Sequence, residues 1–394
     1  NEKVKGLFLE SDETYREANE QLRDLTKERD GIDKKAVKVM VMQDMAELRP
    51  TYVLERGVYS KHKEEVAAAT PAALPVMPLD APRNRLGLAR WLVDPQHPLT
   101  SRVTVNRFWA EFFGQGLVKT TENFGVQGGP ASHPELLDWL ALTFTETGWD
   151  VKALLRLFVT SAAYRQSSEA GIEALAADPQ NRYLSRGPRF RMPSWMIRDQ
   201  ALFAGGLLAP KLGGPSVKPY QPDGLWEEFS FGNIKYERDT GESLYRRSLY
   251  TFWRRIVAPP LFFDSSTRQT CTVKGNRTNT PLHALATLND PCYVEAARVL
   301  AERLLTMPNA TDSDRINAAF RFTMARSGTG QEIDLLVQSI ARLSDQFSAD
   351  REAAKAYLSV GESKPSHELD PVQHAVYASL CLVLLNTDEA LTKE

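Results

Sequence analysis

The stretch Ser132-His133-Pro134-Glu135-Leu136-Leu137-Asp138-Trp139 decides the fold class, because it begins one of many segments with helical patterning. Ser132 and Glu135 have the spacing of a capping box, and Pro134 is tolerated in the first turn of a helix. Apolar residues then recur at three- and four-residue spacing, which predicts an amphipathic helix over residues 134–147.

The same periodicity recurs along most of the chain, and helix start signals accompany it. Asp150 is placed to cap one helix, and Thr280-Pro281 is an N-cap followed by proline at the first helical position. Further helices are predicted over 84–93, 101–113, 151–164, 193–208, 243–256, 281–288, 293–305, 315–325, 332–346 and 371–385. The sequence therefore predicts a mainly α fold, an irregular helical domain with long ordered loops.

The N-terminal part differs in composition. Residues 9–30 are charged and helix-prone, and they predict a surface helix or spacer. Residues 37–42 and 51–59 are rich in β-branched and aromatic residues, and we expect them to form a small antiparallel β pair. Residues 68–82 contain four prolines and predict an extended linker. We therefore expect a junction over 1–82, leading from an upstream domain, and a helical domain over 83–394.

Composition excludes several classes of function. The formal net charge is −2, so no global field attracts nucleic acid, and no apolar run is long enough for a transmembrane segment. The three cysteines include no Cys-x-x-Cys-His, so we expect no haem bound to this chain. The six histidines are scattered, and no metal site is predicted. We expect no cofactor in this chain.

Residues 123–138 offer one candidate catalytic segment. Three glycines precede the predicted helix, and His133 falls in its first turn. A helix N-terminus favours the neutral form of imidazole, so His133 beside Asp138 is a candidate general base. The alternative is a structural role for His133 at the helix cap.

Residues 213–228 combine prolines and glycines with aromatic, amide and carboxylate side chains. Aromatic rings stack on sugars and polar groups bind their hydroxyls, so this loop is a candidate glycan site. A pair of carboxylates would serve glycoside hydrolysis at a suitable separation. The alternative is an ordered loop whose rings fill the core. The ligand-binding candidates are Lys218, Tyr220, Gln221 and Trp226, and the acid/base candidates are Asp223 and Glu227.

Cationic and amide residues occupy two further segments. Asn106 and Arg107 lie on the predicted helix 101–113, where the alternative is an arginine tied to a helix end or carboxylate. Residues 264–281 form a basic loop that leads into the capped helix at Pro281. Arg268, Arg277 and Asn279 there are candidate ligands for sulfate, carboxylate or phosphate.

The order and spacing of these segments, together with 244–253 and 384–389, resemble one known family from about residue 83 onward. It is the planctomycete-specific C-terminal domain of multidomain proteins with c-type cytochrome modules, a domain of unknown function in planctomycetes and verrucomicrobia. His283 and Ala390 depart from the residues usual in that family. The resemblance implies export to the periplasm or cell envelope, and haem c on an upstream module or partner.

Three interpretations of function follow. The first is an extracytoplasmic recognition and scaffold domain that binds a complex or sulfated polysaccharide, or another anionic glycan, beside a c-type cytochrome module. The second is an enzyme, either a cytochrome-coupled oxidoreductase or a carbohydrate-active one, with a cleft built from segments 123–138, 213–228 and 264–281. The third is a purely structural role. The glycan expectation rests partly on the genomic company that the resemblance implies.

Overall fold

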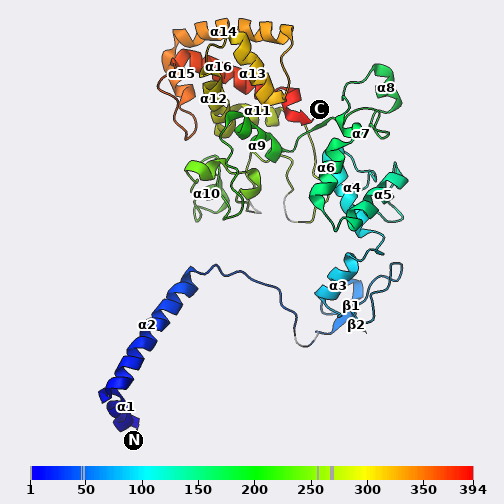
Figure 1. The fold of residues 1–394 in the computed structure, drawn as a ribbon, viewed down its shortest axis with the longest axis vertical. Helices are drawn as coiled ribbons and strands as arrows, with labels where there is room; N and C mark the ends of the chain where they lie inside the picture. Colours follow the sequence, from blue (N-terminus) through cyan, green and yellow to red (C-terminus); the bar gives the residue numbers. More distant parts are fainter. Residues whose placement is uncertain (1, 46, 48, 255–256, 267–269, 394) are drawn as a thin grey trace. The chain divides into compact units, whose positions relative to one another are not determined.

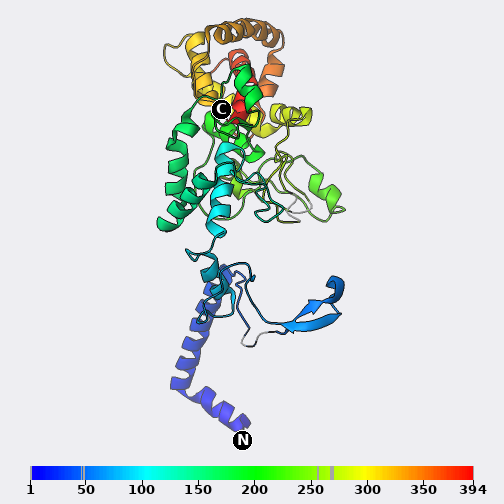
Figure 2. The same ribbon diagram turned by 90° about the vertical axis from the view of Figure 1, so that its right-hand side faces the viewer.

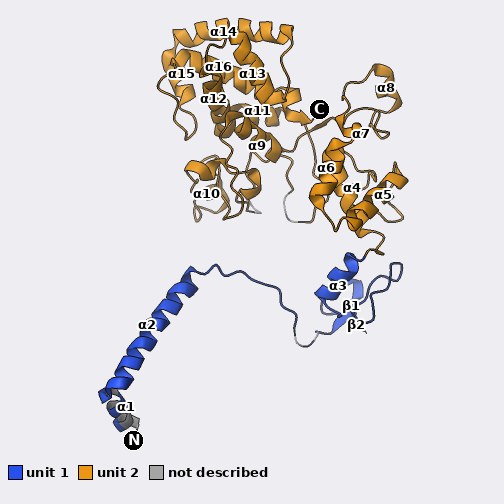
Figure 3. Ribbon diagram, in the orientation of Figure 1, with its two compact units in different colours: residues 1–94 blue, residues 95–394 orange. Residues whose placement is uncertain are grey.

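The computed structural model describes residues 2–45, 47, 49–254, 257–266 and 270–393. The chain divides into two compact units, Asn1–Asp94 and Pro95–Glu394 (Figure 3). Helices dominate both units, and the sheets are two antiparallel pairs of short strands (Figure 1). The predicted mainly α fold is confirmed.

The first unit contains two helices, a hairpin and a third helix. Its elements are α1 (Glu2–Ser11), α2 (Glu13–Lys35), β1 (Thr51–Leu54), a 3-10 turn (Glu55–Gly57), β2 (His62–Val66) and α3 (Arg85–Leu92). The helix predicted over 9–30 is divided between α1 and α2, because Asp12 caps the start of α2. The linker predicted over 68–82 contains turns and no helix or strand.

The β pair exists, but its partners differ from those predicted. β1 pairs with β2 in a hairpin, seen from another side in Figure 2, and Tyr52 stacks on His62 with ring centroids 4.5 Å apart. Residues 37–42 are exposed and belong to no strand, so their predicted pairing was wrong. The hairpin instead closes through residues 55–61, where the Glu55 amide donates to the Lys61 carbonyl at 3.0 Å.

The second unit contains the remaining elements. They are α4 (Thr100–Phe113), α5 (Pro134–Glu146), α6 (Val151–Thr160), α7 (Ala162–Arg165), α8 (Ile172–Ala177), β3 (Phe190–Arg191), α9 (Ser194–Gly205), α10 (Leu225–Phe229), 3-10 turns (Gly241–Tyr245 and Ser248–Tyr250), α11 (Pro281–Asn289), α12 (Pro291–Leu305), α13 (Asp312–Met324), α14 (Gly330–Ala349), α15 (Arg351–Leu358), α16 (Pro371–Leu385), α17 (Asp388–Leu391) and β4 (Thr392–Lys393).

Two hydrophobic cores hold this unit together. The larger is centred on α12 and α16, which are buried along most of their length and pack against each other, with α9 on α12 and α14 and α15 on α16. The smaller lies between α4, α5 and α6, where Trp109 stacks on Phe113 with centroids 3.8 Å apart. β3 and β4 pair in the same unit.

Helix caps follow the sequence signals only in part. The Asp150 side chain accepts from the Ala153 amide, and Pro281 is the first residue of α11, as predicted. The capping box predicted at the start of α5 is wrong. The helix begins one residue later than that box requires, so His133 is the N-cap and Ser132 Oγ instead contacts His133 Nδ1 at 3.0 Å.

The helix predicted over 243–256 is also wrong for the residues described there. The segment consists of two 3-10 turns, with backbone bridges from Arg246 to Ala209 and from Thr251 to Val217. The buried Arg246 guanidinium donates to the carbonyls of Lys211, Gly213 and Pro215. These distant hydrogen bonds pair both terminal nitrogens of a buried cation, and a buried charge is costly without such partners.

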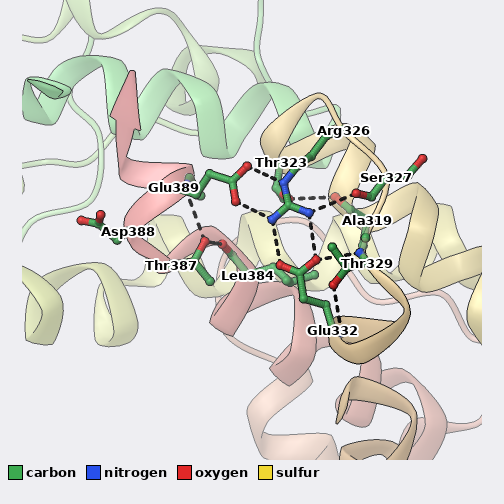
Figure 4. A network of polar contacts seen from close by, with 12 residues as sticks. Ala319, Thr323, Arg326, Ser327, Thr329, Glu332, Leu384, Thr387, Asp388 and Glu389 are labelled. Carbon is green, nitrogen blue, oxygen red and sulfur yellow. Dashed lines mark hydrogen bonds and ion pairs between the residues drawn. The ribbon is translucent and has the colours of Figure 1, made fainter. Parts of the chain in front are cut away.

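An arginine joins three elements near the chain's C-terminal end (Figure 4). Arg326 follows α13, and its guanidinium donates to Glu332 at 2.8 and 2.9 Å and to Glu389 at 2.5 and 2.6 Å. Glu332 also completes a capping box with Thr329 at the start of α14. Two bidentate pairs therefore fix α14 and α17 against the end of α13.

No described helix combines the length and the apolar character needed to cross a membrane.

Candidate functional site

The segment 271–277 borders three cavities in the second unit. The first has a volume of about 290 Å³, the second about 990 Å³ and the third about 860 Å³. Val273 and Gly275 line all three. Trp195 and Glu111 line both the first and the second, so these two cavities share a wall. We call the first the basic cavity and the second the aromatic cavity.

The basic cavity carries an excess of positive charge. Arg107, Lys274 and Arg277 line it, and Glu111 is the one carboxylate among the described lining residues. Arg277 lies 3.8 Å from Glu111 and its side chain is 26% exposed. Burial lowers the pKa of Arg277, and Glu111 offsets this only partly. Because guanidinium stays protonated at neutral pH, the cavity holds a partly desolvated cation.

The end of α4 positions Arg277. Gly114 stops the helix in the left-handed region at φ 78°, and a Cβ there would lie 2.7 Å from the Phe190 ring. Glycine is therefore required for this approach. The Gly114 carbonyl accepts from Arg277 at 3.4 Å, and the guanidinium stacks on Phe190 at 4.3 Å. Phe190 is held in turn by the pairing of β3 with β4.

The aromatic cavity is lined by both apolar and polar side chains. Trp195 is 42% exposed, while Phe262 is buried and stacks on Trp253 with centroids 5.8 Å apart. The Thr251 hydroxyl is buried in the wall and has no hydrogen-bond partner among the described residues. Asp199 also lines this cavity. This combination resembles small-molecule sites, which pair apolar surface with a few placed polar groups.

Two carboxylates of the aromatic cavity already bind protein donors. Asp199 Oδ1 accepts from the Ser248 amide at 2.8 Å and its hydroxyl at 2.6 Å. Asp264 accepts from the Thr278 amide at 2.6 Å and from its hydroxyl at 2.8 Å. Both carboxylates therefore make structural hydrogen bonds, which compete with a role in acid/base catalysis.

The structure separates the predicted catalytic residues from these cavities. His133 is half-buried beside Ser132 and packs edge-on against Tyr183. Asp138 is exposed and accepts from Arg102 at 2.6 Å, and this hydrogen bond lowers the pKa of the carboxyl. A carboxylate held ionised by arginine is poorly suited to proton transfer near neutral pH.

The residues predicted in segment 213–228 gather around α10. Trp226 is buried against Tyr236 and Phe252, and its indole N–H donates to Gln221 at 2.6 Å. Lys218 Nζ lies 5.8 Å from the Phe252 ring. The rings of this loop therefore fill its interior, as the alternative interpretation of the segment expected.

Tyr220 belongs to a buried network in the larger core. Its hydroxyl donates to Glu295 at 2.8 Å and accepts from the Glu362 amide at 2.8 Å. Burial, followed by the charge of Glu295, raises the pKa of Tyr220. Glu295 is fully buried and also accepts from Tyr245 and Ser363. Tyr220 thus satisfies a buried charge and leaves no surface for a ligand.

The other predicted residues have mixed positions. Asn106 is fully buried and bonds both backbone groups of Val118. Asp223 and Asn279 are exposed, and Glu227 is half-buried. Arg268 lies outside the described residues. Of the predicted site residues, the basic cavity brings together Arg107 and Arg277, and none of the described others lines it or its two neighbours.

The single cleft expected from segments 123–138, 213–228 and 264–281 is therefore not formed by His133, Tyr220, Trp226 and Arg277. The sequence analysis named none of Trp195, Trp253 and Phe262 as candidates, and it treated the first two only as parts of helices predicted over 193–208 and 243–256. A usable signal was a tryptophan in the first turn of a helix that follows Pro193. No group of described His, Cys, Asp and Glu residues is placed to bind a metal ion.

Comparison with known proteins gives a family and no function. No curated protein and no solved structure matches the chain. The model of the PSD1 family, described as a protein of unknown function (DUF1553), matches residues 84–340, which include α4, α9 and the 271–277 segment. Because this match spans well over half of the sequence, the chain belongs to the PSD1 family.

Proposed function

We propose that the second unit is a recognition domain that binds a complex polysaccharide in the aromatic cavity. One observation carries the proposal: Trp195, an indole that is 42% exposed, lines the aromatic cavity together with polar side chains such as Gln200 and Arg247. Ring faces pack on the C–H surface of a sugar, and polar side chains bind its hydroxyl groups. A volume of about 990 Å³ accommodates a few sugar units.

Binding fits the site better than catalysis. Enzymes of the glycoside hydrolase class use two carboxylates, one of which must carry a proton. Asp199 and Asp264 each accept hydrogen bonds from protein N–H and O–H donors, so their oxygens are already occupied by protein groups.

The cellular setting is a further part of the proposal. The resemblance of the sequence supports an exported protein that works beside a c-type cytochrome module, with the domain presenting glycan to it. Co-purification of the chain with a haem-staining polypeptide from an envelope fraction would support this setting. Recovery of the chain free of haem protein under mild lysis would contradict it.

The binding claim is tested by calorimetric titration of the purified chain with dextran, xylan, laminarin and galactan. We expect at least one polysaccharide to bind, and Trp195→Ala to weaken that binding about tenfold or more, since tryptophans that become buried on binding are typical hot spots. Trp139→Ala is the matched control, because Trp139 is 51% exposed on α5 and lines none of the three cavities. Equal losses in both variants, or no binding to any polysaccharide, would refute the proposal.

A further inference from the structure

The basic cavity is more than an extension of the aromatic one, because its charge is of the opposite sign. The aromatic cavity is lined by Glu111, Asp199 and Asp264 against Arg247. In the basic cavity, Arg107, Lys274 and Arg277 outnumber Glu111. A ligand that spans the shared wall therefore meets negative charge on one side and positive charge on the other.

Three features leave the cations of the basic cavity available. Arg107 and Lys274 form no ion pair and no hydrogen bond with any described residue. Glu111 is 3.8 Å from Arg277, which is longer than a hydrogen-bonded pair. Glu111 itself is 65% exposed, so water screens its charge.

A helix N-terminus adds to this field. α9 begins at Ser194, has no acidic residue in its first turn and no side-chain cap, and Pro193 and Trp195 at its start line the basic cavity. The positive end of a helix dipole stabilises an anion nearby. Side-chain cations from two segments and a helix end thus face one small volume.

The geometry points to a subsite for an anionic substituent of a glycan, a sulfate ester or a carboxylate, held by Arg107, Lys274 and Arg277 while the sugar ring lies on Trp195. A volume of about 290 Å³ suits one substituent and its sugar, and Trp195 lines both cavities. Guanidinium presents paired N–H donors that match two oxygens of either anion. This subsite rests on the proposed glycan-binding function of the aromatic cavity.

The test compares three ligands with one backbone: dextran, dextran sulfate and carboxymethyl-dextran of matched length. We expect the two charged chains to bind the wild-type protein more tightly than dextran. Arg277→Gln and Lys274→Gln should each weaken binding of the preferred charged chain about tenfold or more, since a hydrogen bond to a charged group has that worth. Both substitutions should leave the affinity for an uncharged chain unchanged. The preference between sulfate and carboxymethyl identifies the anion.

The control is Arg342→Gln, which removes one exposed charge from α14, away from the cavities. Arg342→Gln removes one positive charge, as Arg277→Gln and Lys274→Gln each do. It therefore separates binding at a specific subsite from nonspecific electrostatic attraction between the protein and the charged chain. Losses in Arg277→Gln and Lys274→Gln no larger than in Arg342→Gln would overturn the subsite. If an uncharged chain binds at Trp195 while neither charged dextran gains affinity, the subsite fails and the proposed function stands. If neither charged nor uncharged chains bind, both fail.

Discussion

Asn106→Ala should destabilise the second unit without removing a ligand group. Asn106 is fully buried, its amide N–H₂ donates to the Val118 carbonyl at 3.0 Å, and its oxygen accepts from the Val118 amide at 2.8 Å. Truncation leaves both backbone groups of Val118 buried and unpaired. Each unpaired group costs about 1–3 kcal/mol, so we expect a loss of about 3 kcal/mol.

The assay is urea unfolding followed by circular dichroism, with thermal melting beside it. A loss of that size corresponds to a decrease in Tm of roughly 6 °C for a unit of this size. The neighbouring Arg107→Ala is the control. Its side chain is exposed, so we expect a stability change within about 0.5 kcal/mol but weaker binding of charged glycans.

The reverse pattern would refute this reasoning. If Asn106→Ala melted like the wild type and lost glycan binding, the amide would be a ligand group, as the sequence first indicated. The pair of variants thus tests two adjacent predicted site residues with opposite expected effects.

The remaining predictions concern stability. Arg326 lowers the pKa of Glu332 to about 2, so the stability that this pair contributes is complete above about pH 4.5 and is lost as the pH falls toward 2. In a plot of the urea unfolding midpoint against pH, Arg326→Gln should therefore flatten the slope between about pH 4.5 and 2. An unchanged slope would contradict this prediction. Burial raises the pKa of Asp290 to about 6, so stability should instead fall as the pH rises from about 4 to 6, and Asp290→Asn should abolish this fall in the same plot. Gly361→Ala should destabilise the chain by about 2 kcal/mol or more, since φ at this position is +96° and a Cβ would lie 2.4 Å from the carboxyl carbon of the buried Glu295. A variant with the wild-type Tm would contradict this, because it would show that the loop relaxes without a loss of stability.

Local signals predicted the helices well and non-local contacts poorly. Asp150 and Pro281 mark helix starts through their own backbone geometry, so single-sequence patterns reveal them. The segment around Arg246 has helical periodicity, yet its guanidinium is satisfied by carbonyls about 35 residues away. That contact exists only after folding, and no periodicity encodes it.

The candidate site shows the same division. Arg277 was predicted because a cation in a polar loop is informative on its own. Tyr220 and Trp226 were predicted by composition, but burial decides whether a ring binds a ligand or fills a core, and both are buried. Trp195 has the same side chain as Trp226 but remains 42% exposed. Only the packing of α9 reveals this difference in exposure.

Hydrogen exchange with and without a bound polysaccharide tests the location of the site most directly. The amides of residues 191–196, 247–253 and 271–277 should exchange more slowly in the complex, because these segments line the joined cavities. Slower exchange confined to residues 213–228, with those three segments unchanged, would contradict the account and return the site to the loop around α10.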